Sequence, residues 1–376
     1  MSETGNARNG EARLATLGLW AVPGIGPKAL ESIRGMFDGD LSAVLRAPIG
    51  EWSRAVKLSA TARHCLSRLG SLGELGHRLA AKAKREAVGI AFPGDAAFPA
   101  NLVGLPDAPP LLFYRGTPSS PRRRIAMVGS RHPDHGFLPF ARRFAREVAE
   151  AGVGVVSGAA EGVDRACHWG ALDAGAETWA FLGSALDELD PAQAKLLPYF
   201  LERGGMFYSE LPLGVRASAS TFPRRNRLIS GAADAVLVLR AGETSGALYT
   251  AKAAADQGRP LLAFPGDSRN QAAYGCNLLI RSGRARLCLC ASDVWLAAGL
   301  NPKLAVKPSP AGMPWDLKAL SPDAQRAYQL LDRRPRSFDE LHGGCEMSSA
   351  ALISALCELE LMGLVIQYPG KQYERV

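Results

Sequence analysis

The sequence predicts an α/β protein whose centre is a doubly wound parallel sheet. Four apolar segments have the length of buried strands, and each runs into a corner rich in glycine or serine that precedes a helical pattern. These segments are Ile125–Val128, Val153–Val156, Thr178–Leu182 and Ala235–Leu239. Strands that alternate with helices through short connections form parallel sheets covered by helices.

The corners after these strands form the candidate binding edge. In a doubly wound sheet, ligands sit beyond the carboxyl ends of the strands, where helix N-termini and bare backbone amides favour anions. In chain order the corners carry Gly129, Ser130 and Arg131, then Ser157 and Gly158, then Gly183 and Ser184, and finally Ser245 and Gly246. We therefore expect an anion site built from backbone amides at this edge.

The segment 222–231, FPRRNRLISG, adds positive charge directly before the fourth strand. Its guanidinium groups suit phosphate and carboxylate, so the segment predicts one wall of a phosphate pocket. The alternative for such a charge run is a solvated helix face with an internal ion pair. In the pocket interpretation Arg224 and Arg227 join Arg131 in neutralising phosphate, and Asn226 either caps the turn or bonds a base or sugar. A solvent-facing position stays open for Arg225, because adjacent helix residues point about 100° apart.

Neither a dinucleotide site nor a catalytic pair is expected. The first strand leads into VGSRHPDHG rather than GxGxxG, and the second ends at Ser157 and Gly158 without an acidic ribose partner, so NAD is not expected. Asp164 and His168 are four residues apart on a predicted helix, a spacing typical of a structural hydrogen bond rather than of catalysis. No cofactor, metal or catalytic residue is predicted.

Composition places the chain among ordinary globular proteins, with a modest excess of positive charge. It has 376 residues, 47% of them hydrophobic, and a net charge of +8. Residues 1–121 and 122–300 each carry four excess positive charges, whereas 301–376 is neutral. Such a surplus permits polyanion binding without requiring it.

The cysteines and the N-terminal residues indicate a reduced, cytoplasmic protein. Seven cysteines occur without a CxxC pair, which favours neither a zinc site nor a disulfide scaffold. Cys288 and Cys290 are expected as core thiols on one face of a short strand. The first dozen residues lack an apolar signal region and no apolar run reaches membrane length, so no membrane association is expected.

Taken in order, the motifs resemble one family. The chain carries VGSR (128–131), SGAAEGVDRACHWGAL (157–172), SELPLG (209–214), FPRRNRLISG (222–231), SGALYTAKAAADQGRPLLAFPG (245–266) and GCNLLIRSG (275–283). This set is similar to the DNA-processing protein A family, also called DprA or Smf. The resemblance implies an extended Rossmann-like domain that binds single-stranded DNA, protects incoming strands, forms a homodimer and loads the RecA recombinase in natural transformation. Two positions depart from the pattern. Glu161 stands where many members have a basic residue, and Asp190-Pro191 replaces the Tyr-Pro often found after the third strand.

The predicted domains are 1–88, 89–300 and 319–376, with a proline-containing linker at 301–318. Residues 1–88 are expected to form a small helical (SAM-like) domain, in which PGIG (23–26) resembles a helix-hairpin-helix turn. Its Gly24, Gly26 and Lys28 either touch DNA or only allow two helices to pack. The last domain has the winged-helix order of elements. Its candidate recognition helix, about Ser348–Met362, carries Glu358 and Glu360 and no basic residue, which favours a partner or packing role over groove reading.

Two other functions remain open at this point. Rossmann-like nucleotide phosphoribohydrolases have a similar phosphate pocket, but their signature places a catalytic Glu where this chain has Thr250 and Ala251. A protein-binding scaffold would use FPRRNR as a site for an acidic partner.

Overall fold

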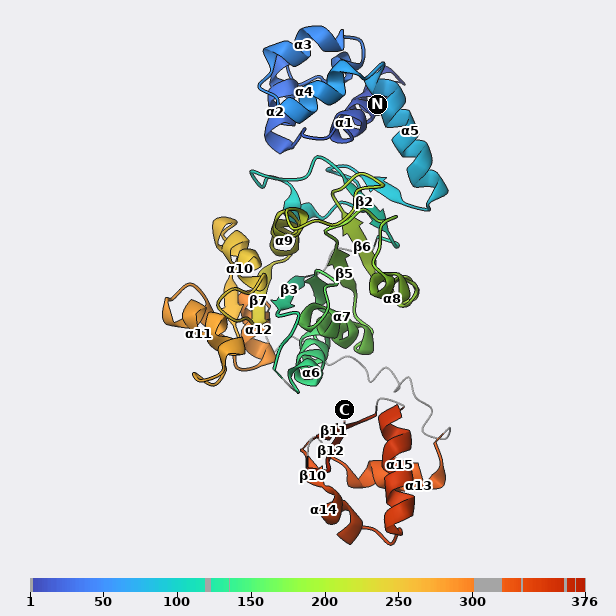
Figure 1. Ribbon diagram of the computed structural model, residues 1–376, viewed down its shortest axis with the longest axis vertical. Helices are drawn as coiled ribbons and strands as arrows, with labels where there is room; N and C mark the ends of the chain where they lie inside the picture. The colour runs from blue at the N-terminus through green and yellow to red at the C-terminus, as the bar shows by residue number, and fades with distance from the viewer. Residues whose placement is uncertain are drawn as a thin grey trace.

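The computed structural model describes residues 3–118, 123–134, 136–300, 320–332, 334–361, 364–368 and 370–375. The predicted linker 301–318 lies outside these residues. Three parts follow one another along the longest axis: a helical domain at the top, the sheet domain in the middle and a small α/β domain at the bottom (Figure 1).

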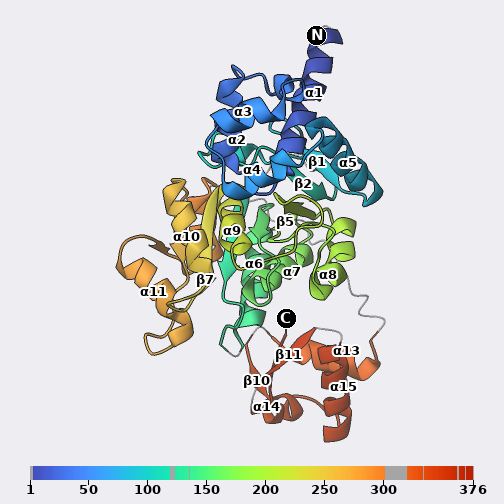
Figure 2. The ribbon, with the colours of Figure 1, turned by 45° about the horizontal axis from the view of Figure 1, so that its top comes forward.

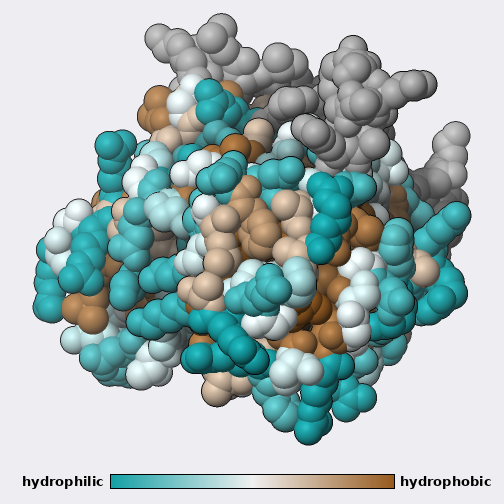
Figure 3. Space-filling model, turned by 90° about the horizontal axis from the view of Figure 1, so that it is seen from above, coloured by the Kyte–Doolittle hydropathy of each residue, from teal (hydrophilic) through white to brown (hydrophobic). Residues whose placement is uncertain are grey.

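The N-terminal domain is helical, as the sequence predicts. It contains α1 (Glu3–Trp20), α2 (Pro27–Met36), the 3-10 turn η1 (Leu41–Leu45), α3 (Ile49–Ala55), α4 (Ala60–Ser67) and α5 (Leu72–Arg85). It packs on the sheet domain, where the indole of Trp20 donates to the Glu210 carbonyl at 2.6 Å and Lys82 pairs with Asp187 at 2.7 Å. Seen from this end, the surface mixes hydrophilic and hydrophobic residues (Figure 3).

The central sheet has nine strands in the order β1-β2-β6-β5-β4-β3-β7-β8-β9. They are β1 (Gly89–Ala91), β2 (Leu112–Arg115), β3 (Arg124–Gly129), β4 (Gly154–Ser157), β5 (Thr178–Phe181), β6 (Met206–Ser209), β7 (Ala235–Arg240), β8 (Leu261–Ala263) and β9 (Arg286–Leu287). Pairing is parallel from β6 through to β9, and only β1-β2 and β2-β6 are antiparallel. The predicted α/β class with a mostly parallel sheet is therefore confirmed.

Helices cover both faces of this sheet because the side chains of β3 alternate between them. Ile125 and Met127 pack into a core shared with α6 (Phe137–Ala149), α7 (Val163–Asp173) and α12 (Ala291–Ala297). Ala126 and Val128 pack into the opposite core, with α9 (Thr221–Gly231) and α10 (Ala247–Asp256). The remaining helical elements are η2 (Ala100–Leu102), α8 (Pro191–Glu202), η3 (Gln271–Ala273) and α11 (Tyr274–Arg281). Both ribbon views place α10 and α11 together and α8 at the other side of the sheet (Figures 1 and 2).

The strand order reverses between β3 and β7. From β3 the chain moves outward through β4, β5 and β6, and then returns to pair β7 with the free side of β3, in the register Ile125 to Ala235. Loops that leave β3 and β7 turn away from each other at such a switch point, and ligands of doubly wound sheets bind in the crevice between them.

The C-terminal domain has the predicted winged-helix order. It consists of α13 (Pro322–Leu330), β10 (Arg336–Ser337), α14 (Phe338–Gly343), α15 (Ser349–Leu361), β11 (Val365–Tyr368) and β12 (Gln372–Arg375), around a core of its own. Its hairpin meets α6, where the buried carboxylate of Glu374 accepts from Arg143 at 2.6 Å and from the Tyr368 hydroxyl at 2.7 Å. Met362, the predicted end of the recognition helix, lies outside the described residues.

One expectation about the cysteines is wrong. Cys288 is buried, but Cys290 is exposed, because β9 ends at Leu287 and Cys290 is the residue that caps the start of α12. Within the described residues no cluster of His, Cys, Asp and Glu side chains could hold a metal ion. No described helix is both long and apolar enough to span a bilayer.

Candidate nucleic-acid interface

A cleft of about 550 Å³ opens where β3 and β7 end, and we call it the switch-point pocket. Six of the predicted contacts line it: Gly129, Ser130, Arg131, Asn226, Ser245 and Gly246. Further lining comes from Phe222, Arg225, Thr244 and Thr250. The topology thus brings together corners that are more than 110 residues apart in the sequence, as the parallel-sheet prediction requires.

Two glycines allow the loops of this pocket to approach each other. Gly162 has φ +88°, and a Cβ there would lie 2.4 Å from the carbonyl oxygens of Ser130 and Arg131. At Gly129 a Cβ would lie 2.7 Å from the side chain of Val163. Any larger residue at either position would push the β3 loop away from α7.

The backbone amides of Gly129 and Gly158 are already occupied. Gly129 N–H donates to Asp164 Oδ1 at 3.3 Å, and Gly158 N–H donates to Asp164 Oδ2 at 3.2 Å. Burial raises the pKa of the Asp164 carboxyl, while the charge of Arg225 and these hydrogen bonds act in the opposite direction. A buried carboxylate thus links both loops and engages these two amides, and their contact with a phosphate stays a prediction.

His168 is fully buried and bonds to the loop after β4 and to β5. Its Nε2 accepts from Ala159 N–H at 3.2 Å, and its Nδ1 lies 2.6 Å from the hydroxyl oxygen of Thr178. Burial, together with the charges of Arg225 and Arg165, lowers the pKa of His168 to about 3, so the ring is neutral at physiological pH. Asp164 and His168 thus bond to loop backbone at Gly129, Gly158 and Ala159 rather than to each other, which is not the pair that their spacing suggested.

Arg225 is buried, and the solvent-facing position left open for it is wrong. Its Nη1 donates to the carbonyl of Gly158 at 2.5 Å and also to the carbonyl of Phe181. Burial lowers the pKa of Arg225 to about 10, against the charge of Asp164, which leaves the guanidinium protonated at neutral pH. This side chain ties α9 to the ends of β4 and β5.

Arg224 and Arg227 lie outside the switch-point pocket. Arg227 Nη2 donates to the buried carboxylate of Glu210 at 2.5 Å, its Nε lies 3.3 Å from Asp107, and Arg224 lies 3.8 Å from Glu210. Burial raises the pKa of Glu210, and both arginines oppose that shift. Both side chains are thus engaged in ion pairs, the alternative raised for this charge run, and a contact with DNA stays a prediction.

Ser157 and Asn226 also have structural partners. Ser157 is fully buried and its hydroxyl donates to the carbonyl of Met127 at 2.6 Å, so it holds β4 to β3. The Asn226 amide donates to the Gly246 carbonyl at 3.2 Å, and its oxygen accepts from Arg225 Nε at 3.1 Å. Asn226 therefore holds the loop at Gly246 before α10, and a contact with a base or sugar stays a prediction.

The sequence interpretation missed Phe222. Its ring lies near two arginines, with the guanidinium carbon of Arg131 4.8 Å from the ring centroid and that of Arg225 5.9 Å away. A Cβ at Gly183 would lie 2.9 Å from this ring, so that glycine makes room for it. Helical spacing was the available signal, because Phe222, Arg225, Asn226 and Ile229 share one face of α9 and all line the pocket.

Comparison with known proteins identifies the family. A family model for "DNA recombination-mediator protein A" matches residues 89–299, and a "DprA winged helix domain" model matches residues 311–371. The chain belongs to the DNA recombination-mediator protein A family. It is similar to "Protein Smf" of Synechocystis, with 29% identity over 75% of this chain and 79% of that protein. It is also similar to "Protein Smf" of Escherichia coli, with 39% identity, but the match spans only about half of each chain, 51% and 52%.

A solved structure supports the fold of this family member. The structure of DNA processing protein A (DprA) from Streptococcus pneumoniae superimposes with a TM-score of 0.59 at 26% identity, covering 76% of this chain and 97% of that one. The recognised resemblance and the predicted fold are thereby confirmed.

The structure also locates three further places that the sequence singled out. Glu161, which departs from the family pattern, is exposed and lies beside the pocket rather than among its lining residues. Thr250 and Ala251, where the phosphoribohydrolase alternative needs an acid, are both buried on α10. In the N-terminal domain Gly24 has φ +87° and starts the turn into α2, and Lys28 is exposed, so whether this turn touches DNA stays a prediction.

Proposed function

We propose that this protein binds single-stranded DNA in the switch-point pocket. The pairing of Arg131 with Phe222 carries the proposal. An exposed guanidinium 4.8 Å from a half-buried ring offers one group for a phosphate and one for the face of a base. Thr244, Ser245 and Gly246 add hydroxyl groups and backbone at the start of α10 on the opposite wall.

The chemistry of the pocket favours single strands over duplex. Phe222 can stack only on a base whose face is free, and bases in a duplex already stack on their neighbours. Phosphate contacts carry no sequence information, so binding is expected to be independent of sequence. Arg131 is the residue on which the salt dependence of binding should rest.

The wider role follows from family membership. We infer that the protein protects incoming strands and loads the RecA recombinase on them in natural transformation, acting in the cytoplasm as a non-enzymatic binding protein. A homodimer is part of this proposal. Its support is the edge strand β9, where Leu287 is 46% exposed, together with nearby Leu289 and Leu296, which are 62% and 60% exposed.

A salt titration tests the binding proposal. Affinity is measured for an oligothymidylate, for a duplex of equal length and for nucleoside monophosphates. We expect the logarithm of affinity for single strands to fall linearly with the logarithm of salt, by about 0.7 for each phosphate neutralised. Equal affinity for duplex, or no salt dependence, contradicts the proposal, and release of free base from a monophosphate would favour the phosphoribohydrolase alternative.

Two further measurements test the partners. RecA filament formation on strands coated with a single-strand-binding protein should be faster when this protein is present. Light scattering at micromolar concentration should give a dimer, and Leu289→Glu should reduce it to a monomer without loss of fold. A wild-type protein that stays monomeric with and without DNA removes the dimer from the proposal.

A further inference from the structure

We propose that the bound strand extends beyond the switch-point pocket along helix α7, across Arg165 to a second stacking site at Trp169. This inference rests on the proposed binding of single-stranded DNA. It adds a subsite for further nucleotides of the same strand, made by residues outside the motifs that were predicted to bind.

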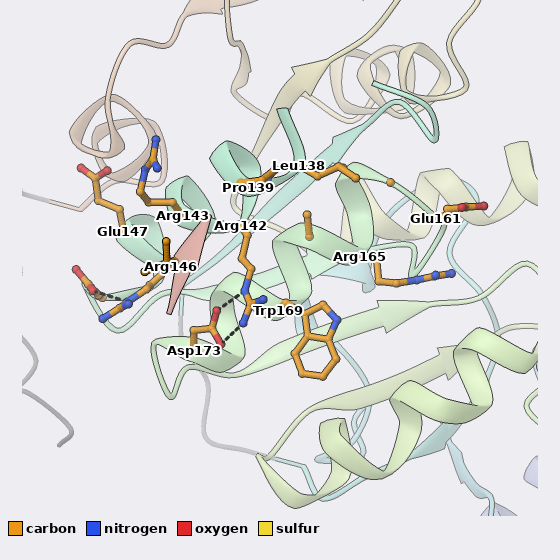
Figure 4. A pocket seen from close by; sticks show the side chains of 14 residues that line it. Leu138, Pro139, Arg142, Arg143, Arg146, Glu147, Glu161, Arg165, Trp169 and Asp173 are labelled. Carbon is orange, nitrogen blue, oxygen red and sulfur yellow. Dashed lines mark hydrogen bonds and ion pairs between the residues drawn. The ribbon is translucent and has the colours of Figure 1, made fainter. Parts of the chain in front are cut away.

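The first observation is that three clefts adjoin one another and share lining residues. The switch-point pocket shares Arg131, Ala160, Phe222 and Arg225 with a neighbouring cleft of about 510 Å³ between α7 and the start of α8. That second cleft shares Glu161 and Arg165 with a third, of about 610 Å³, which lies over α6 and α7 and is closed by Val365 of β11. Figure 4 shows the third cleft, with Arg165 extending toward the side where Glu161 lies. A flexible strand that leaves Phe222 therefore has a path that leads over Arg165.

The second observation is that Arg165 differs from the other arginines of the third cleft. Arg142 makes a bidentate ion pair with Asp173 at 2.5 and 2.9 Å, and Arg146 Nε lies 3.2 Å from Glu150 Oε1. Arg165 enters no ion pair with a described residue, and its Nε is shielded from water without a hydrogen-bond partner among those residues. A guanidinium with unused donors at the junction of two clefts is suited to a phosphate.

The third observation is the ring beside it. Trp169 follows Arg165 by four residues, so the two side chains lie on one face of α7. The indole is half-buried and is held by Tyr199, whose ring centroid lies 5.6 Å away, and by the guanidinium of Arg142 at 5.9 Å. Arg165 and Trp169 thus repeat the combination of Arg131 and Phe222, which is the arrangement of a surface that binds successive nucleotides.

Glu161 explains why this path would be weak. Its carboxylate is exposed at the same junction as Arg165 and repels a phosphate there. Asp173 and Glu150 are paired with Arg142 and Arg146. Of the two other carboxylates that line the third cleft, Glu147 and Glu161, Glu161 is the one that also lines the second cleft together with Arg165. The subsite should therefore increase affinity for long strands without being needed for short ones.

The test compares oligothymidylates from about 4 to about 20 nucleotides, because a strand must be long enough to reach the second ring. Wild-type affinity should rise with length beyond what the switch-point pocket covers. In Arg165→Ala and in Trp169→Ala, the affinity for the longest strands should fall at least about fivefold, and the affinity for the shortest strands should not change. Trp169→Phe should keep the wild-type dependence of affinity on length. Arg146→Ala combined with Glu150→Ala is the control, because it removes an arginine of the same cleft together with the carboxylate that this arginine neutralises.

Fluorescence gives a readout that a purely structural role would not change. Long strands should quench tryptophan emission in the wild type more than in Trp169→Phe, and short strands should quench the emission of the two proteins equally.

If Arg165→Ala and Trp169→Ala bind the whole series like the wild type, the inference fails and the proposed function stands. Equal losses for short and long strands also overturn it. If the two variants lose binding of polyglutamate while keeping the full length dependence, the third cleft belongs to an acidic protein partner instead. A wild type that binds no oligonucleotide ends both proposals.

Discussion

The two faces of helix α9 place the same side chain in different surroundings. On one face Arg225 is buried below the switch-point pocket, bonded to the carbonyls of Gly158 and Phe181 and adjacent to Phe222. On the other face Arg224 and Arg227 approach the buried carboxylate of Glu210. The comparison shows that a run of arginines next to a binding edge can be used mostly for structure, with its members divided by the 100° rotation between helix residues.

The charge best placed for a ligand lies on a loop instead. Arg131 is exposed at the end of β3, over the ring of Phe222, while three arginines of α9 have partners inside the protein. This division predicts that substitutions on α9 affect stability first and that substitutions at Arg131 affect DNA binding first.

Arg225→Ala should have the largest effect, and it should be on stability. Removing the guanidinium leaves the buried carboxylate of Asp164 without its opposing charge and two buried carbonyls without their donor, at a cost of about 3 to 5 kcal/mol. The measurement is urea denaturation at neutral pH. Arg224→Ala is the matched control, because that side chain is half exposed and 3.8 Å from its partner, and it should change stability by less than about 0.5 kcal/mol. Similar stabilities for the two variants would remove the distinction between the faces.

Arg227→Ala should cost about 2 kcal/mol, because Glu210 stays buried after its hydrogen-bond donor is lost. Combining it with Glu210→Gln should restore part of this loss, which a double-mutant cycle would report as coupling. The salt slope for single-stranded DNA should stay at the wild-type value. A shallower slope would instead establish Arg227 as a phosphate contact, as the sequence pattern predicted.

Arg131→Ala should change binding and leave stability unaltered. An exposed guanidinium at the mouth of the pocket contributes one phosphate contact, so the salt slope should become shallower by about 0.7, and affinity should fall for all sequences alike. Unchanged binding by this variant would move the site away from the β3 corner.

Glu161→Lys should tighten binding by a few-fold at low salt and make the slope steeper, because it removes a repulsion beside Arg165 and adds a cation. Glu161→Gln separates the two effects, since it removes the repulsion alone. If both variants bind like the wild type, DNA does not pass this carboxylate.

Truncation after Gly299 should have the smallest effect, leaving affinity for short single strands within a few-fold. The removed segment is neutral, so it adds nothing to the long-range field that attracts a polyanion. Its acidic Glu358 is engaged with Ser321, at 2.9 Å from the backbone nitrogen and 2.6 Å from the hydroxyl. Loss of most of the affinity by a folded truncated protein would place a DNA contact in the winged-helix domain, first of all near Lys371.

The sequence by itself determined the class of fold, the sheet edge where the switch-point pocket opens, and the family. Alternating apolar strands and helical patterns were sufficient for the parallel sheet, because these periodicities are local properties of the chain. The same local signal located the glycine and serine corners, five of whose predicted residues line one pocket.

Only the tertiary structure decided which polar groups are available to a ligand. Asp164 accepts from the amide of Gly129, 35 residues before it, and Glu210 accepts from Arg227, 17 residues after it, so neither contact follows from a local pattern. Cys290 was expected in the core but is exposed, because β9 ends at Leu287. Periodicity tells which residues share a face of an element, but the partner that each face meets depends on packing across the whole chain. For that reason the arginines of FPRRNR could be found from sequence, while their division between structure and binding could not.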